Sequence, residues 1–172
     1  MAALHMRVRA PPPRGQWLTL LGFAVLVFAV AAFAAWGSSD ARAFYGDLVK
    51  PSWAPPSAVF GPVWIFLYAL MAMAAWFVWR ARGSIELVGA QLGLFVAQLL
   101  LNGLWSWLFF TWQLGALALV DICLLWLLLL ATVVQFWRVS RLAAVLLLPY
   151  LLWVSFATAL TAATWRMNPT LL

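Results

Sequence analysis

The chain has 172 residues, of which 67% are hydrophobic and only 8% carry a charged side chain. Ordinary soluble domains are about half apolar and about a quarter charged, so this composition excludes a soluble globular protein and indicates an integral membrane protein. The net charge of +6 does not indicate a nucleic-acid-binding protein, because the lysines and arginines are scattered at the ends of apolar runs.

Long apolar runs predict the architecture. A helix needs about 20 residues to cross the roughly 30 Å of hydrocarbon in a bilayer. The runs that meet this length predict an all-α bundle of five transmembrane helices, at about 17–36, 61–80, 88–109, 114–137 and 142–165. Residues 1–16 then form a basic tail, 17–168 the transmembrane domain and 169–172 a C-terminal tail. A signal peptide is the alternative interpretation of the first run, but that run is too long and Ala34–Trp36 is a weak cleavage site.

The basic residues are divided unequally between the two ends of the predicted helices. The more basic end holds Arg7, Arg9, Arg14, Arg80, Arg82, Arg138 and Arg141. The other end holds Arg42, Lys50 and Arg166. The positive-inside rule then places the N-terminus in the cytoplasm and the first loop outside. The short N-terminus and the Ala/Leu-rich spans favour a bacterial cell membrane.

The connection between the first two predicted helices, from Gly37 to Phe60, is much longer than the others and contains the stretch KPSWAPP. Its apolar side chains, Tyr45 and Trp53 among them, argue against disorder, and its prolines restrict the backbone. We expect a structured loop that caps a pocket at the helix ends. A loop packed on the bundle for stability alone is the alternative.

The third predicted helix has two different faces. At 100° per residue, Gln98, Asn102 and Trp105 share one face. Buried amides need partners, so this face should look into the bundle, either as interhelical hydrogen bonds or as the polar end of an apolar pocket. The small residues Gly89, Gly93 and Ala97 lie on the opposite face and predict a homodimer through this helix, with packing inside the monomer as the alternative.

The second and fifth predicted helices carry aromatic residues about one turn apart. Trp64 and Tyr68 lie on the second, and Trp153, Ala157 and Leu160 share a face of the fifth. Each set alone is more often core than binding site. Three helices that present indoles and a few polar groups inward favour a flat aromatic ligand.

Groups that could carry chemistry are sparse. Cys123 and His5 are each the only residue of their kind, so we expect no disulfide and no metal site. Paired carboxylates, a Ser-His-Asp set and a phosphate-binding loop are all missing, so we expect no hydrolytic apparatus and no cofactor. Asp121 is a carboxylate within a span, which is either functional or simply protonated or hydrogen-bonded.

These residues bring out a family resemblance. The chain resembles the tryptophan-rich sensory protein / translocator protein family, also called TspO/MBR or peripheral-type benzodiazepine receptors. The segments that carry the resemblance are FYGDLVKPSWAPP (44–56), VFGPVWIFLYALM (59–71), AQLLLNGLWSWLFF (97–110), ALVDICLLW (118–126) and PYLLWVSFATAL (149–160). They cover residues 40–168 almost completely, and the first 16 residues lie outside the resemblance.

The resemblance implies a pocket capped by the first loop, usually in a dimer, and ligands such as porphyrins, haem-pathway intermediates, cholesterol-like lipids and synthetic benzodiazepines. The ligand-binding residues that it implies are Tyr45, Trp53, Trp64, Tyr68, Gln98, Asn102, Trp105, Trp153, Ala157 and Leu160. Two departures matter. Family members often have Leu-Asn where this chain has Leu160-Thr161, and LTAATWR lacks the tyrosine of the cholesterol-recognition pattern.

We therefore expect a non-catalytic membrane protein that binds porphyrin-like or haem-like small molecules and senses or moves them. The alternative from another class is an enzyme that degrades porphyrin in a light- or oxygen-dependent reaction, with Trp64 as the candidate redox-active indole. A third hypothesis is a scaffold that recruits partners and dimerises without affinity for a ligand.

Overall fold

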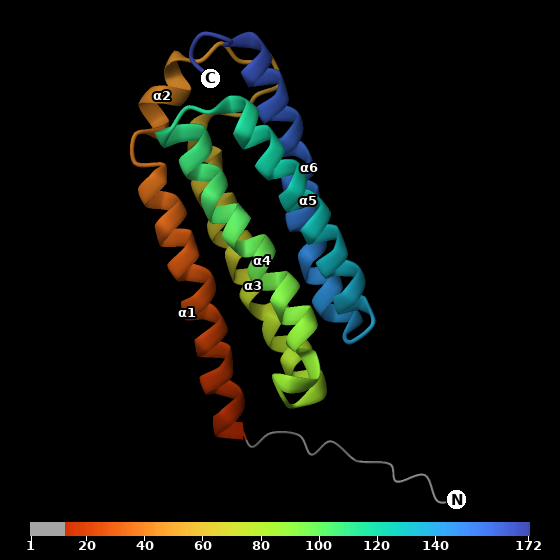
Figure 1. Ribbon diagram of the computed structural model, residues 1–172. Coiled ribbons are helices and arrows are strands. Elements are labelled where there is room, and N and C mark those ends of the chain that lie inside the picture. Colours follow the sequence, from red (N-terminus) through yellow and green to blue (C-terminus); the bar gives the residue numbers. More distant parts are fainter. Residues whose placement is uncertain (1–12) are drawn as a thin grey trace, which may run out of the picture.

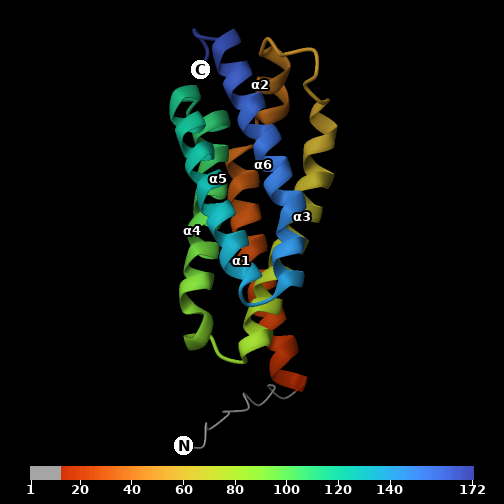
Figure 2. The same cartoon turned by 90° about the vertical axis from the view of Figure 1, so that its right-hand side faces the viewer.

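The protein is described from a computed structural model, in residues 13–172. The long helices are α1 (Pro13–Gly37), α3 (Phe60–Arg82), α4 (Gly89–Ser106), α5 (Gly115–Trp137) and α6 (Arg141–Met167). They lie side by side along one direction (Figures 1 and 2), and the described residues contain no strand. The expected all-α five-helix bundle is confirmed. Residues 1–12 of the predicted basic tail lie outside the described residues.

All five long helices are long and apolar enough to cross a membrane. Their outward-facing surfaces carry many exposed large apolar side chains; Leu18, Ile65 and Leu152 are 70%, 65% and 71% exposed. An apolar surface of this extent is unfavourable in water but suits lipid, where the backbone of each helix satisfies its own hydrogen bonds. The protein is therefore an integral membrane protein.

The helix boundaries differ from the predicted ones by a few residues, and the reasons are local. α1 begins about one turn before residue 17, and α6 extends to Met167. α3 ends at Arg82 and is capped by Gly83, whose positive φ of 72° is a left-handed conformation that glycine adopts without strain. α4 continues as a π-helical segment, Trp107–Thr111, in which the Trp112 amide donates to the Trp107 carbonyl oxygen at 2.8 Å. Such wide turns are frequent at functional sites.

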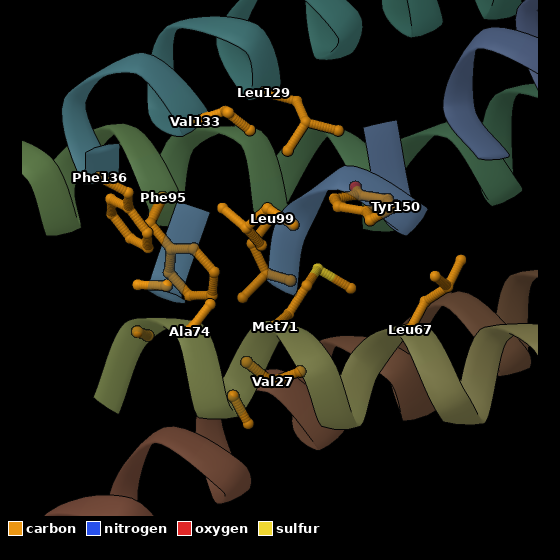
Figure 3. Packing of buried hydrophobic residues seen from close by; sticks show 14 of the residues in the cluster. Val27, Leu67, Met71, Ala74, Phe95, Leu99, Leu129, Val133, Phe136 and Tyr150 are labelled. Atoms are coloured by element: carbon orange, nitrogen blue, oxygen red, sulfur yellow. The ribbon is translucent and has the colours of Figure 1, made fainter. Parts of the chain in front are cut away.

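The apolar core lies between α3, α4, α5 and α6 and also includes Val27 of α1. Met71, Phe95, Leu99, Leu129 and Phe136 are fully buried there, and their side chains interdigitate across the facing helices (Figure 3). α1 is the most exposed of the five helices and packs on the outside of α3 and α4. The C-terminal half of α1 is therefore largely outside the core and is available to line a cavity.

The C-terminal end of α1 is held closely against the π-helical segment. The Trp107 indole N–H donates to the Phe33 carbonyl oxygen at 3.1 Å, and its ring stacks on the Phe33 ring with centroids 5.1 Å apart. The Thr111 hydroxyl donates to the Gly37 carbonyl oxygen at 2.7 Å. A Cβ at Gly37 would lie only 2.8 Å from the Trp107 ring, so glycine permits this approach.

Candidate functional site: a capped aromatic pocket

A pocket of about 800 Å³ lies where α1, α3, α4 and α6 meet the loop between α1 and α3. Its size is that of a small-molecule site, which typically has about 300–1,000 Å³. α3 contributes Trp64 and Tyr68, α4 contributes Asn102 and Trp105, and its other walls come from α1, α6 and the loop. Most of the lining is apolar.

Seven of the ten predicted ligand-binding residues lie on the wall of this pocket. They are Tyr45, Trp64, Tyr68, Asn102, Trp105, Trp153 and Ala157. These residues come from the loop and three separate helices, so the fold brings together side chains that are far apart in the sequence. Their convergence makes this pocket the candidate site.

The other three predicted residues are not on the pocket wall. Trp53 is 49% exposed and packs edge-on against Phe156, with ring centroids 5.8 Å apart. Leu160 is buried away from the pocket. Gln98 is fully buried one turn before Asn102, and neither atom of its amide has a hydrogen-bond partner among the described residues.

One end of the pocket is polar. The Tyr68 hydroxyl donates to Asn102 Oδ1 at 2.6 Å, and both residues are at least 95% buried. The expected amide at the polar end of an apolar pocket is thus present at Asn102, where it also forms an interhelical hydrogen bond. A ligand with hydrogen-bonding groups on one edge would meet them here.

The walls formed by α3, α4 and α6 are rich in aromatic side chains. The Trp64 ring lies 5.5 Å from that of Tyr68 and, edge-on, 6.1 Å from that of Tyr150, between centroids. Phe60 contacts Trp153 edge-on at 5.9 Å. Rings held in place by other rings lose little freedom when a planar ligand packs on them, so this lining suits flat aromatic molecules.

The loop that caps the pocket is ordered by its own short helix, α2 (Ala41–Asp47), which the sequence analysis did not predict. Tyr45 is buried in a cluster with Leu108 and Phe109 of the π-helical segment, and its hydroxyl donates to the Pro55 carbonyl oxygen at 3.1 Å. Burial raises the pKa of the Tyr45 hydroxyl above its ordinary value of 10.0, so it remains a donor at neutral pH. The proline-rich stretch is thereby tied to α2.

The Lys50 ammonium group closes the C-terminal end of α2. It donates to the carbonyl oxygens of Tyr45 and, at 2.7 Å, of Leu48, and it lies 4.8 Å from the centre of the Tyr45 ring. A cation at a helix C-terminus is favourable because the unpaired carbonyl groups there carry partial negative charge. The Lys50 ammonium group therefore interacts with groups of the loop itself.

A side chain just beyond the end of α6, Asn168, joins the loop to the bundle by hydrogen bonds. Asn168 Oδ1 accepts from the Val49 amide at 2.9 Å, and its Nδ2 donates to the Val49 carbonyl oxygen at 2.8 Å and to the Thr164 carbonyl oxygen at 2.7 Å. Asn168 is only 4% exposed. The capping loop is thus fixed to the helix ends by hydrogen bonds.

We expect Asn168→Ala to increase opening of the loop about tenfold, because two hydrogen bonds to Val49 are lost. Hydrogen exchange of the loop amides would measure the change. Asn168→Asp keeps an acceptor for the Val49 amide but loses both donors, so its exchange should be intermediate. Equal exchange in the wild type and in Asn168→Ala would contradict the role given to this side chain.

Several residues of the pocket wall were not predicted from the sequence. The α1 wall is formed by Phe28, Ala31, Ala32, Ala34 and Ala35, and the loop adds Arg42 and serines. α1 is apolar on every side, so its periodicity marks no inward face. A run of alanines near its end was the available signal, since small side chains leave room beside a helix. Among the described residues, no group of histidine, cysteine and acidic side chains could hold a metal ion.

The exposed residues of the pocket wall show where it opens. Phe28 of α1 and Ile65 of α3 line the pocket and are 42% and 65% exposed. Ala32, Ala35, Gly61 and Pro62 also line it and are exposed. The open side thus includes the gap between α1 and α3, on a surface that faces lipid when the helices span a bilayer.

Comparison with known proteins agrees with this architecture. The model of the TspO/MBR family matches residues 23–166. The chain is 44% identical to the tryptophan-rich protein TspO of Chlorobaculum tepidum, over 73% of this chain and 80% of that protein. It is 40% identical to the human translocator protein, over 92% of this chain and 93% of that protein. It is 39% identical to the tryptophan-rich sensory protein of Cereibacter sphaeroides, over 73% and 77% of the two chains.

The match begins within α1, runs almost to the end of α6, and includes α1, α3, α4, α6 and the capping loop, which line the pocket. Its length and the identities place the relationship well beyond a shared composition of apolar helices. This chain belongs to the TspO/MBR family of integral membrane proteins.

Proposed function

We propose that the protein binds flat tetrapyrroles, the porphyrins and related haem-pathway molecules, in the capped pocket and thereby senses or moves them. Sterol-like ligands of similar flatness are a second class that the shape admits. The observation that carries the proposal is the pocket itself: about 800 Å³, walled by Trp64, Trp105 and Trp153, with the Tyr68–Asn102 hydrogen bond at one end. An indole face and a planar macrocycle are complementary in shape and polarity.

The relatives support this role. Their names describe a sensory protein in one bacterium and a translocator in mammals, and both descriptions fit a membrane protein that binds a small molecule. The open side of the pocket between α1 and α3 would let a lipid-soluble ligand enter from the bilayer. Binding of a macrocycle in the pocket is therefore the first step to test.

Titration with protoporphyrin IX in detergent, followed by quenching of tryptophan fluorescence and by the porphyrin absorbance, would test the proposal. We expect Trp64→Phe to weaken binding about three- to tenfold, because a smaller ring forms a weaker stacking contact. Trp137→Phe is the matched control, since Trp137 is exposed and does not line the pocket. Equal affinities for the wild type and both variants would place the porphyrin elsewhere.

We also propose a homodimer through α4. Gly89 and Gly93 are exposed, and a Cβ at either position would have no neighbouring atom within 4 Å, so packing within the protomer does not explain these glycines. Ala97 is half-buried on the same helix. Small residues on a lipid-facing stripe let the backbones of two copies approach closely.

Gly93→Leu should raise the dissociation constant of the dimer about tenfold by separating the two α4 helices. Light scattering in detergent and cross-linking in bilayers would measure it. Gly22→Leu on α1 is the control, because a Cβ there is equally free of neighbours. If both variants dimerise like the wild type, the interface lies on another helix.

The charges at the helix ends support a sidedness. Arg80, Arg82, Arg138 and Arg141 lie at the connections α3–α4 and α5–α6, at the end of the bundle opposite α2 (Figure 1). We propose that this end faces the cytoplasm, as the positive-inside rule predicts, so that the capped pocket lies near the outer surface of a bacterial cell membrane.

A further inference from the structure

Arg42 of α2 is the one charged side chain on the pocket wall within the described part of the chain. Unlike Lys50, the Arg42 side chain forms no hydrogen bond or ion pair with any residue from 13 to 172. The nearest acidic residues in the sequence, Asp40 and Asp47, form no salt bridge with it. A guanidinium group without a protein partner thus stands at the edge of an apolar pocket.

The position of Arg42 in the pocket distinguishes one end from the other. α2 lies at the end of the bundle where α1 stops (Figure 1), outside the membrane-spanning segments. Tyr68, at the polar end that it shares with Asn102, is eight residues into α3, or about 12 Å along that helix. The pocket therefore carries a cation at its outer rim and neutral hydrogen-bonding groups deeper in the bundle.

The rim around Arg42 is otherwise polar and uncharged. Ser39 and Ser57 also line the pocket. The Ser38 hydroxyl donates a hydrogen bond to the Ala34 carbonyl oxygen at 2.9 Å. An anionic group on a ligand is strongly disfavoured in the apolar interior, so it would stay at the rim. There it would meet a guanidinium fork, whose geometry matches a carboxylate.

We propose that Arg42 binds a carboxylate of the ligand, so that the pocket selects carboxylate-bearing flat ring systems over their neutral esters. The inference deepens the proposed function, on which it rests, by naming the ionic class of the ligand and its orientation. The ring packs between the indoles of α3, α4 and α6, with its acidic edge toward α2. Entry between α1 and α3 keeps that edge at the water interface throughout.

Protoporphyrin IX and its dimethyl ester form a matched pair of probes, because they share the macrocycle and differ in charge. Both would be titrated in a neutral detergent against the wild type, Arg42→Leu, Arg42→Lys and Arg138→Leu. Arg138→Leu removes the same charge at the opposite end of the bundle. Arg42 is exposed and outside the core, so its variants should keep the fold, and circular dichroism would check this.

We expect the wild type to prefer the diacid about fivefold, and Arg42→Leu to lose that preference while its affinity for the diester stays unchanged. Arg42→Lys should keep part of the preference, and high ionic strength should reduce it. Equal binding of diacid and ester to the wild type would overturn the role of Arg42 but would not contradict the pocket as the binding site. Binding of neither probe would instead remove the proposed function.

Discussion

We expect Gln98→Met to stabilise the folded protein and Asn102→Leu to destabilise it, although both substitutions remove a buried amide from the same face of α4. Gln98 is fully buried, and its amide has no protein partner in the described structure. Leaving such a group unpaired costs about 1–3 kcal/mol. Methionine has a similar shape without that penalty, so the free energy of unfolding should rise.

Asn102 differs because its Oδ1 accepts the hydrogen bond from the Tyr68 hydroxyl at 2.6 Å. Asn102→Leu leaves that hydroxyl buried without its acceptor, which should lower the free energy of unfolding by about 1–3 kcal/mol. Tyr68→Phe combined with Asn102→Leu should recover part of the loss, because removing both partners leaves no unpaired group.

Thermal unfolding in detergent, measured for the single and double variants side by side, would decide between these effects. A destabilised Gln98→Met protein would mean that the amide has a partner beyond the described protein atoms. An additive double variant would contradict the Tyr68–Asn102 pair as a coupled unit. The contrast therefore tests the placement of both amides independently of any ligand.

The second large effect concerns Gly37, the last residue of α1. A Cβ at this position would lie 2.8 Å from the Trp107 ring, which is much closer than atoms can pack. We expect Gly37→Ala to push the ring away, with loss of its stacking on Phe33 and of its hydrogen bond to the Phe33 carbonyl oxygen, at about 1–3 kcal/mol. The pocket should also change, since its lining includes Ala34 and Ser38 beside Gly37.

Gly22→Ala, on the same helix, is the control. A Cβ at Gly22 would have no neighbouring atom within 4 Å, so this substitution should be neutral or should stabilise by up to about 1 kcal/mol. Melting temperatures and porphyrin affinities of the two variants would be compared. If Gly37→Ala matched Gly22→Ala in both, the close contact between α1 and the π-helical segment would not constrain the protein.

The sequence alone determined the membrane class, the five spans and the two faces of α4. The length and polarity of helices in a bilayer are set by the solvent, and their faces by a fixed 100° rotation, so both can be obtained without tertiary contacts. The prolines and aromatic residues of the loop between the first two predicted helices predicted that this loop is structured and stiff. Seven of the residues implied by the family resemblance also converge on the pocket wall.

Only the tertiary structure decided which residues reach the pocket. Gln98 and Asn102 share a face, but Gln98 is fully buried away from the pocket whereas Asn102, one turn later, lies on its wall. α1 is apolar on every side, so the helices on which it packs decide which of its faces points inward. Arg42 reaches the rim because α2 packs on the π-helical segment that follows α4, and a contact between segments so distant in the chain leaves no periodic signal in the sequence.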